Sequence, residues 1–433
     1  MQNLNRRQFL KLAGAASALA ALPRTVGAAT TTARVVVVGG GFGGATAAKY
    51  IRMWGDNVQV TLVDPNASHI SCVLSNLVMT GALSMSRITL GYGALKTNHG
   101  VNVLQGRAVA IDGAGNTVTV STASGNRVLP YDHLVLSPGI DFIAPPAGAW
   151  DANLTPHAWQ AGAQTTLLKN QLASMRNGDL FVMTVPKSPY RCPPGPYERA
   201  CVAADFLKRK KRFGAKVIVL DANASIQAEP LAFSEAFNVT HAGMIEYVPN
   251  ATVQSVVSST RSIVTSARTI KNAKVLNYIP NQKAGAIAAG LSLNAQGFVP
   301  VHPLTYEVAG YPNIHVIGDA CAVPSSDGKA VPKSGHMANS EAKVCADAIV
   351  RALVGEAADD NVTTNSACYS PITARTASWL SANFNYGDIY DAAGNVKGKG
   401  MHRVDLGEAD KIDGDGYEDM FTWADSLFAD SFI

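Results

Sequence analysis

The sequence has little charge for its length and, beyond its first residues, no long apolar run. Only 16% of its 433 residues are charged, while 47% are hydrophobic. It has 36 Lys and Arg against 32 Asp and Glu, and residues 1–28 contain four of the basic residues and no acid, so the rest is neutral. A neutral chain lacks the basic surface that attracts nucleic acids and anionic membranes. No later segment approaches the ~18 consecutive apolar residues of a membrane-spanning helix.

Short repeats and low-complexity tracts are also missing beyond the N-terminus. With 38 glycines and nearly half its residues hydrophobic, the composition excludes a disordered, collagenous or coiled-coil chain. The length exceeds that of one ordinary core and predicts two or three domains.

The N-terminus has the pattern of an export signal. Arg6-Arg7 stands before Phe-Leu-Lys, an Ala/Leu stretch runs to Leu22, and small residues follow around 26–29. This pattern predicts a twin-arginine signal peptide over residues 1–28 and a periplasmic protein. A membrane anchor is the alternative, but the apolar stretch is short and rich in alanine, which favours cleavage.

Export changes the interpretation of the six cysteines, because disulfides persist in an oxidising compartment. The sequence does not determine how they pair. They are Cys72, Cys192, Cys201, Cys321, Cys345 and Cys368.

A glycine-rich turn follows the first predicted strand, the β-branched run 34–38. A helix from Ala45 and a second strand over 58–63 come next, and that strand ends at Asp64. In this context Gly39 makes the tight turn, Gly41 lets a pyrophosphate approach the backbone, and Gly44 lets helix and strand pack closely. Asp64 is placed to accept a hydrogen bond from a ribose hydroxyl. A glycine-rich turn without a ligand is the alternative.

A second unit of the same kind is predicted from strands 180–185 and 216–220 and a helix over 197–212. Its connecting loop, 186–196, holds five prolines and one glycine. Prolines lack the N–H groups that a pyrophosphate needs. We therefore expect this unit to lack a nicotinamide site and the electrons to come from another donor than NAD(P)H.

Two later segments complete the predicted cofactor site. A buried strand over 314–317 ends at Gly318-Asp319, and such a pair contacts the ribityl chain of FAD in two-domain flavoproteins; a simple turn is the alternative. Lys333, Ser334 and Gly335 then open a helix running to about Leu353. Its positive N-terminal end would face the flavin pyrimidine edge.

The predicted fold class is α/β, with two Rossmann-like domains and a C-terminal α+β interface domain. The predicted divisions are the signal peptide 1–28, the first part of the FAD-binding domain 29–150, the second Rossmann-like domain 151–275, the second part of the FAD-binding domain 276–355 and the C-terminal domain 356–433. Beyond about residue 357 the pattern is aromatic and irregular. Residues 413–416, Asp-Gly-Asp-Gly, match part of a calcium loop without its other ligands, so we interpret them as a turn and expect no metal.

Four segments carry a family resemblance over nearly the whole mature chain. They are 190–199 (YRCPPGPYER), 277–285 (NYIPNQKAG), 156–162 (PHAWQAG) and 368–370 (CYS). With them the chain resembles the flavoprotein subunit of flavocytochrome c sulfide dehydrogenase, within the wider group of sulfide:quinone reductases and disulfide-reductase-like flavoproteins.

The resemblance implies a covalent FAD, joined through a thioether at Cys72; a buried free cysteine is the alternative. It also implies a redox-active disulfide between Cys192 and Cys368, against the alternatives of a structural disulfide or unpaired thiols. Cys192 lies just before a helix N-terminus, whose dipole lowers a thiol pKa. The other three cysteines are expected to be structural or free, and Cys321 is the strongest rival for a place near the flavin.

The implied activity is oxidation of sulfide to zero-valent sulfur or polysulfide, with electron transport through FAD to a c-type cytochrome. The partner is expected to be a small cytochrome subunit in a heterodimer, because this chain has no C-x-x-C-H haem motif. Glu198 either handles protons beside the disulfide or favours the helix dipole from its first turn.

Two alternative functions remain. One is an exported flavin-binding or electron-relay subunit without sulfide activity. The other is a sulfide:quinone reductase, which the terminal segment disfavours because it lacks the Lys/Arg face of a membrane-surface helix.

Overall fold

The structure is a computed structural model that describes residues 32–326, 330–391 and 393–433. The predicted signal peptide and its cleavage site lie outside these ranges. Residues Thr32–Ile433 form one compact unit by their contacts. The predicted domain boundaries at 150, 275 and 355 therefore stay predictions.

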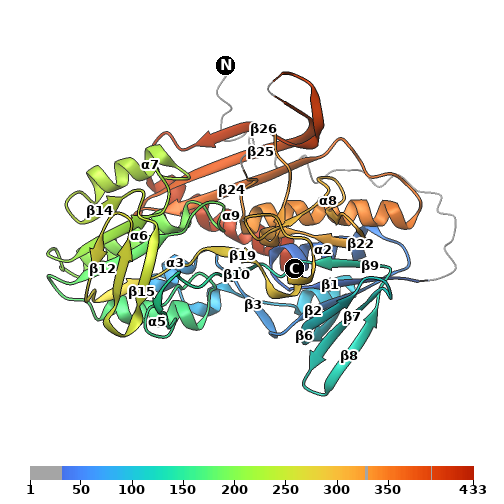
Figure 1. The fold of residues 1–433 in the computed structure, drawn as a ribbon, viewed down its shortest axis with the longest axis horizontal. Helices are drawn as coiled ribbons and strands as arrows, with labels where there is room; N and C mark the ends of the chain where they lie inside the picture. Colours follow the sequence, from blue (N-terminus) through green and yellow to red (C-terminus); the bar gives the residue numbers. More distant parts are fainter. Residues whose placement is uncertain (1–31, 327–329, 392) are drawn as a thin grey trace. The chain divides into compact units, whose positions relative to one another are not determined.

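The first parallel sheet is built from two distant parts of the chain (Figure 1). Its strands in spatial order are β21 (Glu307–Val308), β22 (Tyr311–Val316), β9 (His133–Leu136), β1 (Ala33–Val38), β2 (Val58–Asp64) and β5 (Asn102–Gln105). Only β21 pairs antiparallel. The last four residues of β1 and all of β9 are buried, as expected of central strands in a parallel sheet. The β-branched run that predicted β1 is therefore a core strand.

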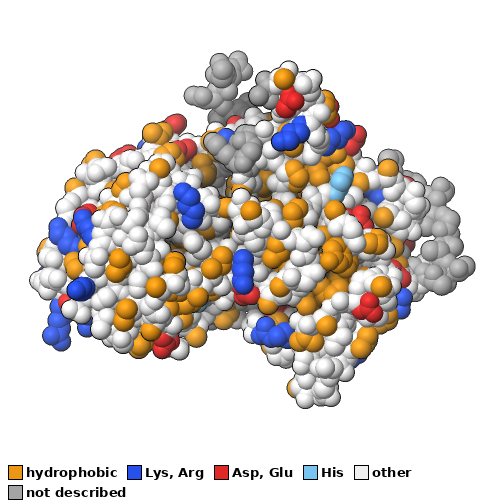
Figure 2. Space-filling model, viewed as in Figure 1, with side chains coloured by type: hydrophobic (Ala, Val, Ile, Leu, Met, Phe, Trp, Pro, Cys, Tyr) orange, Lys and Arg blue, Asp and Glu red, His pale blue; other side chains and the backbone are white. Residues whose placement is uncertain are grey.

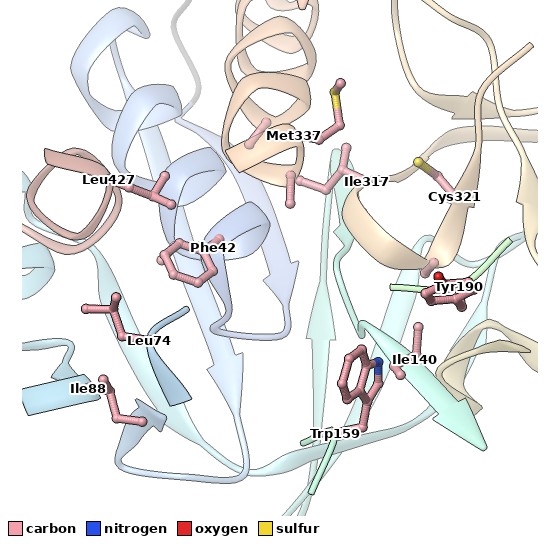
Figure 3. Packing of buried hydrophobic residues seen from close by; sticks show 14 of the residues in the cluster. Phe42, Leu74, Ile88, Ile140, Trp159, Tyr190, Ile317, Cys321, Met337 and Leu427 are labelled. Atoms are coloured by element: carbon pink, nitrogen blue, oxygen red, sulfur yellow. The ribbon is translucent and has the colours of Figure 1, made fainter. Parts of the chain in front are cut away.

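Three helices pack together beside this sheet: α2 (Phe42–Trp54), α8 (Gly335–Leu353) and α9 (Gly414–Phe432). Figure 3 shows Phe42 of α2 with Leu427 of α9 on one side and Met337 of α8 on the other. The Phe42 ring stacks on that of Phe428 at 6.0 Å between centroids. The apolar face of α9, at the C-terminal end of the chain, is thus buried against the glycine-loop helix.

The second parallel sheet has the order β14 (Ile245–Val248), β13 (Lys216–Asp221), β12 (Leu180–Val185) and β18 (Val275–Asn277). Helix α6 (Gly195–Arg209) connects β12 to β13, and α5 (Ala163–Ala173) precedes β12. The sequence predicted α6 to run to residue 212. It ends earlier because Lys211 takes a left-handed φ of 56°, which a right-handed helix does not contain.

The C-terminal part has both strands and a helix, in agreement with the predicted α+β class, although its sequence pattern is irregular. It forms an antiparallel sheet of β24 (Thr363–Pro371), β25 (Ala377–Tyr390) and β26 (Val396–Glu408), followed by α9. Val396, Val404 and Leu406 of β26 are exposed, so apolar residues do not mark one face of these strands and the period-two signal is lost. The predicted turn at 413–416 is wrong: Asp413 caps α9 by accepting from the backbone N–H of Gly416 at 2.8 Å.

The remaining elements are short connections and small sheets. A meander contains β6 (Arg107–Asp112), β7 (Thr117–Thr122) and β8 (Gly125–Pro130). A further sheet contains β11 (Gly148–Ala149), β15 (Val253–Val257), β16 (Ser262–Thr265) and β17 (Thr269–Ile270). Two-stranded pairs are β3 (Ser68–Ile70) with β4 (Thr89–Gly91), β10 (Ile140–Phe142) with β19 (Gln282–Ala284), and β20 (Val299–Pro300) with β23 (Cys321–Ala322). The short helices are α3 (Ser75–Met79), α4 (Gly93–His99) and α7 (Pro230–Glu235).

Charged side chains are sparse and mixed on the face drawn in Figure 2, where Lys and Arg gather in no single patch. This distribution agrees with the neutral composition of the chain. Among the helices that the structure describes, none combines the length and apolar content needed to cross a bilayer.

Candidate functional site

A cavity of about 950 Å³ lies at the carboxyl ends of the strands of the first sheet. That volume is at the upper end for small-molecule sites, and strand ends of an open parallel sheet are where such folds bind ligands. It is lined by the loops that follow β1, β2, β9 and β22, by the first residues of α6 and α8, and by part of β24. Both α/β units and the C-terminal sheet therefore contribute to one site.

The glycine loop has the geometry that its spacing predicts. Gly39 takes a φ of 99°, and a Cβ there would lie 2.2 Å from the carbonyl oxygen of Ser137. A Cβ on Gly44 would lie 1.8 Å from the carbonyl oxygen of Gly39, so α2 packs against the loop without room for a side chain. Gly44 does not line the cavity, whereas Gly39 and Gly41 do. A Cβ on Gly41 would meet nothing closer than 3.6 Å, which leaves the cavity side open to a ligand.

Asp64 is the last residue of β2 and lines the same cavity. Its Oδ2 accepts from the backbone N–H of Gly40 at 2.7 Å, and its Oδ1 accepts from that of Asn66 at 2.8 Å. A carboxylate has about four acceptor positions, so Asp64 holds the glycine loop and keeps capacity for a ribose hydroxyl.

The start of α8 reaches the cavity through Ser334 and Gly335. The Ser334 hydroxyl caps the helix by accepting from the backbone N–H of Met337 at 3.1 Å. Lys333, however, does not line the cavity. Its ammonium donates to the carbonyl of Cys321 and lies 3.9 Å from the centroid of the Phe298 ring. The side chain of Lys333 therefore does not take part in the cavity as predicted. Its backbone does lie near the site, since its carbonyl accepts from the N–H of Cys192 at 2.7 Å.

Gly318 and Asp319 also line the cavity, at the end of β22. Gly318 takes a φ of 71°, and its N–H donates to the Glu341 carboxylate at 2.7 Å. Asp319 lies with its carboxylate 4.0 Å from Nε of Arg191. Burial raises the pKa of Asp319, and Arg191 opposes that rise.

The cavity brings together three cysteines, Cys72, Cys192 and Cys368. All six cysteines are free thiols in the structure. Cys201 and Cys345 are buried within helices, away from the cavity lining. The predicted rival Cys321 is also buried outside the lining, with its sulfur 3.6 Å from the Glu341 carboxylate.

Cys192 is held in a strained position. Its φ of 57° lies in the left-handed region, which non-glycine residues adopt at a cost and mainly at functional sites. A Cβ on Gly195 would lie 2.7 Å from the Cys192 sulfur and 2.9 Å from the ring of Trp159. The first residue of α6 must therefore be glycine for this thiol to stay in place.

The expected low pKa of Cys192 is wrong. Burial raises the pKa of this thiol well above its usual range, and a thiolate at Cys368 and the carboxylate of Glu198 raise it further, while Arg191 opposes them. Burial also raises the pKa of Cys368 to about 12. Desolvation of a buried thiolate outweighs the helix dipole here. Both Cys192 and Cys368 line the cavity, and a charge on Cys368 raises the pKa of Cys192.

Glu198 lines the cavity from the first turn of α6. Burial raises the pKa of its carboxyl group to about 8, against a hydrogen bond from Asn76. That bond runs from Nδ2 of Asn76 to Oε1 at 2.9 Å. A carboxyl group with a pKa near neutrality suits proton transfer. This favours the proton-handling interpretation over the helix-dipole one.

A buried network connects the sequence segments that carry the family resemblance. Arg199 of α6 donates to Asn76 at 2.9 Å, to Asn277 at 3.1 Å, and to the carbonyls of His157 and Ala158. Its guanidinium also lies 4.8 Å from the ring centroid of Trp159. These segments are distant in sequence and meet behind the Cys192 loop, which fixes its position.

The loop before α6 is held by hydrogen bonds to side chains of a later segment. Its N–H groups at Lys187 and Arg191 donate to the side chains of Asn281 at 3.0 Å and Gln282 at 2.8 Å. Asp221, which ends β13 as Asp64 ends β2, is fully buried. Its Oδ2 accepts from the hydroxyls of two tyrosines, Tyr197 at 2.7 Å and Tyr247 at 2.9 Å. In the second unit the loop N–H groups and the strand-end acid have hydrogen-bond partners within the protein. In the first unit the glycine loop and Asp64 line the cavity.

The residues of the cavity fit a bound FAD. Three buried polar atoms of its lining residues have no hydrogen-bond partner in the described structure: His69 Nε2, Arg191 Nε and Asp319 Oδ1. Buried polar groups of this kind need a partner, and a polar cofactor supplies one. The open face of Gly41 and the N-terminus of α8 add room and a positive dipole end for such a group.

Three residues that line the cavity were not predicted from the sequence. Arg191 and Trp159 stand beside predicted residues, and Asn76 stands four positions beyond Cys72. Arg191 and Trp159 lie within segments quoted for the resemblance, but nothing in the local pattern distinguishes a cavity residue from a loop residue. The backbone carbonyl of Trp159 is 3.7 Å from the Cys72 sulfur.

Three family models match parts of the chain. Residues 165–280 match the central part of the sulfide dehydrogenase [flavocytochrome c] flavoprotein chain, and residues 33–169 match pyridine nucleotide-disulphide oxidoreductase. Residues 3–23 match the twin-arginine translocation pathway signal sequence, so the predicted export to the periplasm is confirmed.

A curated relative and two solved structures resemble the chain. The sulfide dehydrogenase [flavocytochrome c] flavoprotein chain of Chlorobaculum thiosulfatiphilum is 55% identical over 37 residues, which are 8% of this chain and 77% of the relative. The sulfide:quinone oxidoreductase of Aquifex aeolicus has a TM-score of 0.73 at 18% identity, over 92% of this chain and 91% of that one. An NAD-dependent persulfide reductase of A. fulgidus has a TM-score of 0.59 at 16% identity, over 92% and 76%. The structural matches establish the predicted α/β fold.

Proposed function

The chain belongs to the family of sulfide dehydrogenase [flavocytochrome c] flavoprotein chains, and we propose that it oxidises sulfide in the periplasm and passes the electrons through FAD to a c-type cytochrome. The product is zero-valent sulfur or polysulfide. The observation that carries the proposal is that Cys192, Cys368 and Glu198 line the same cavity as the glycine loop.

FAD, which the flavoprotein family implies, supplies a two-electron acceptor that can release its electrons one at a time. The residues proposed to hold FAD are those predicted from the sequence, with two changes. Gly44 acts by letting α2 pack against the glycine loop, and Lys333 acts by holding Cys192 through its backbone carbonyl. The lining members of this set are Gly39, Gly41, Asp64, Cys72, Gly318, Asp319, Ser334 and Gly335.

The sulfur chemistry is thiol–disulfide exchange. In the oxidised enzyme Cys192 and Cys368 form a disulfide, and hydrosulfide attacks one of its sulfurs. A new sulfur–sulfur bond forms there as a persulfide, the old bond breaks, and the other cysteine leaves as a thiolate. Because burial raises the pKa of both thiols, the leaving thiolate takes up a proton readily. Glu198, protonated below a pKa of about 8, is the proposed donor.

Substitution of the cysteines tests this function. With sulfide added to the oxidised holoenzyme, flavin absorbance is expected to bleach in the parent protein and in Cys345→Ser, a buried thiol outside the cavity. Cys192→Ser and Cys368→Ser are expected to lose the bleaching by at least a hundredfold, because no disulfide can form. Equal bleaching in all four proteins would exclude the disulfide mechanism.

The same assay separates the two alternatives. If sulfide leaves the parent flavin oxidised while a c-type cytochrome reoxidises the chemically reduced flavin, the chain is an electron relay without sulfide activity. If a soluble quinone analogue accepts the electrons and the cytochrome does not, it is a quinone reductase. The burial of the α9 apolar face against α2 favours the cytochrome as acceptor, since that face is unavailable to a membrane.

We further propose that FAD is tethered to Cys72, which lines the cavity as a half-buried thiol. The intact mass of the denatured protein is expected to exceed that of the mature chain by one FAD. The excess is expected to vanish in Cys72→Ala and to persist in Cys345→Ala. A parent mass equal to the bare chain would show that FAD is held without a covalent bond.

A further inference from the structure

A second buried carboxyl group lies behind the cysteine pair. Glu229 is fully buried and takes a left-handed φ of 50° immediately before α7. Its Oε1 accepts from the Ser370 hydroxyl at 2.6 Å, and its buried Oε2 has no hydrogen-bond partner in the described structure. The sulfide chemistry described above gives this group no role, yet a buried carboxyl group is costly to retain.

Glu229 is connected to the cavity from two sides. Ser370 stands two residues after Cys368 on β24, so both side chains point to the same side of the strand. The carboxylate of Glu229 is the charged neighbour that raises the pKa of Cys368 most, and it also raises the pKa of Glu198. The group therefore lies within electrostatic reach of the cysteine pair and of the proposed proton donor.

A third carboxyl group continues from Glu229 to the surface. Glu408, half-exposed at the end of β26, accepts at 3.0 Å from the N–H groups of Leu231 and Ala232 at the start of α7. Its charge raises the pKa of Glu229. Figure 1 shows α7 beside the β26 end of the C-terminal sheet. Glu198, Glu229 and Glu408 thus form a series from the cavity lining, through the core, to solvent.

We propose that Glu229 relays protons between the cavity and Glu408, as a positioning residue that acts through Glu198 and Cys368. The inference rests on the proposed function for its proton source. Oxidation of one hydrosulfide to zero-valent sulfur releases one proton and two electrons. The cytochrome takes the electrons alone, so the proton must leave the buried site. It moves from Glu198 to Glu229 and then to Glu408 as one O–H bond breaks and another forms at each step.

The environment of Glu229 suits reversible protonation. Burial raises the pKa of its carboxyl group to about 7, against the hydrogen bond from Ser370. The ionisable groups that interact with it are Cys201 and Glu198 of α6, Cys368 of β24 and Glu408 of β26. All of these groups are thiols or carboxyl groups, so none of them supplies a positive charge to an ionised Glu229. The pKa of Glu229 therefore stays near neutrality.

The test follows proton release when ferricyanide oxidises the dithionite-reduced holoenzyme, with a pH dye in weak buffer. Glu229→Gln keeps the shape and the acceptor for Ser370, and is expected to slow proton release roughly tenfold or more while leaving bound FAD and thermal stability near the parent values. Glu235→Gln, an exposed acid at the end of α7, is expected to behave as the parent. Release at the parent rate in Glu229→Gln would overturn the relay.

A second variant and a second readout keep the inference testable if Glu229→Gln fails to fold. Ser370→Ala removes a donor that lowers the pKa of Glu229, so the midpoint of the pH profile is expected to rise. In the infrared spectrum of the oxidised holoenzyme, a protonated-carboxyl band that is missing in Glu229→Gln is expected to titrate near neutrality, and its midpoint is expected to move upward in Ser370→Ala. An unmoved band and profile would overturn the inference. Because none of these measurements uses sulfide, their failure is distinct from failure of the sulfide assay.

Discussion

The two α/β units of this chain share a topology and differ at the same three positions. In the first unit the loop after β1 is glycine-rich, the first turn of α2 has no acid, and Asp64 faces a cavity. In the second unit the loop after β12 is proline-rich, the first turn of α6 contains Glu198, and Asp221 is buried under Tyr197 and Tyr247.

The difference shows how one fold supports two kinds of site. A helix N-terminus with free N–H groups and no nearby acid binds phosphate. In the second unit, side-chain amide oxygens of Asn281 and Gln282 already accept from the loop N–H groups of Lys187 and Arg191. What the second unit presents at its helix start instead is a thiol, Cys192, and a proton donor. Ligand specificity thus lies in the loop chemistry and not in the strand order.

The largest expected effect comes from closing the glycine loop. In Gly44→Ala the new Cβ would collide with the carbonyl of Gly39, which is backbone and cannot move aside. We expect loss of bound FAD and a fall of about 3 kcal/mol or more in the free energy of unfolding. Gly93→Ala, where a Cβ meets nothing within 4 Å, is the control for FAD content and chemical denaturation. Retained FAD in Gly44→Ala would contradict the assigned packing role.

The acid in the first turn of α6 is the next place to test the contrast. With hydrosulfide concentration held constant, flavin bleaching is expected to slow as the pH rises through about 8, where Glu198 loses its proton. Glu198→Gln is expected to lower the rate roughly a hundredfold and to remove this pH dependence. An unchanged profile in the variant would assign the pH dependence to another group.

Glu198→Gln is expected to lower the rate of bleaching but to make the free energy of unfolding less dependent on pH. The folded pKa of Glu198 lies above its usual value, so the parent loses stability as the pH rises from about 4.5 to about 8. Over this pH window Glu198→Gln is expected to lose less of its free energy of unfolding than the parent does. Denaturant unfolding of both proteins at several pH values measures the difference.

Exchanging the two strand-end acids for amides tests their separate roles. Asp221→Asn is expected to reduce the free energy of unfolding by about 1–3 kcal/mol, since it disturbs buried hydrogen bonds, without changing FAD content. Asp64→Asn is expected to weaken FAD binding roughly tenfold with a smaller loss of stability. The binding is measured in a Cys72→Ala background so that a tether does not hide the affinity. If Asp221→Asn also lost FAD, the two units would be more closely coupled than their contacts indicate.

The smallest expected effect is none. NADH and NADPH are expected to leave the oxidised flavin spectrum and the melting temperature of the holoenzyme unchanged, because a ligand that binds the folded state would raise that temperature. In the second unit, Tyr197 and Tyr247 donate to the strand-end acid Asp221, and the proline-rich loop offers few N–H groups to a pyrophosphate. A rise in melting temperature with either nucleotide would contradict the interpretation that the second unit lacks a nucleotide site.

Local sequence patterns predicted the parts of the site that depend on backbone geometry. The glycine spacing predicted the tight turn at Gly39 and the close packing at Gly44, and the β-branched run predicted the buried strand β1; the structure has both. Sequence patterns did not predict the structure where buried side chains do not recur at the spacing of a strand or a helix, or where contacts from distant segments decide a side chain's direction. The strands β25 and β26 carry apolar side chains on both faces, and the direction of the Lys333 side chain depends on a carbonyl and a ring from other segments.

The sequence by itself determined the export signal, the two α/β units and the difference between their loops, because each depends on residues adjacent in the chain. Only the tertiary structure decided which cysteines share a cavity, that their thiols are harder to ionise than a helix terminus suggests, and that Glu198 and Glu229 are buried. These properties depend on distance and desolvation, which arise when residues hundreds of positions apart are packed into one low-dielectric interior.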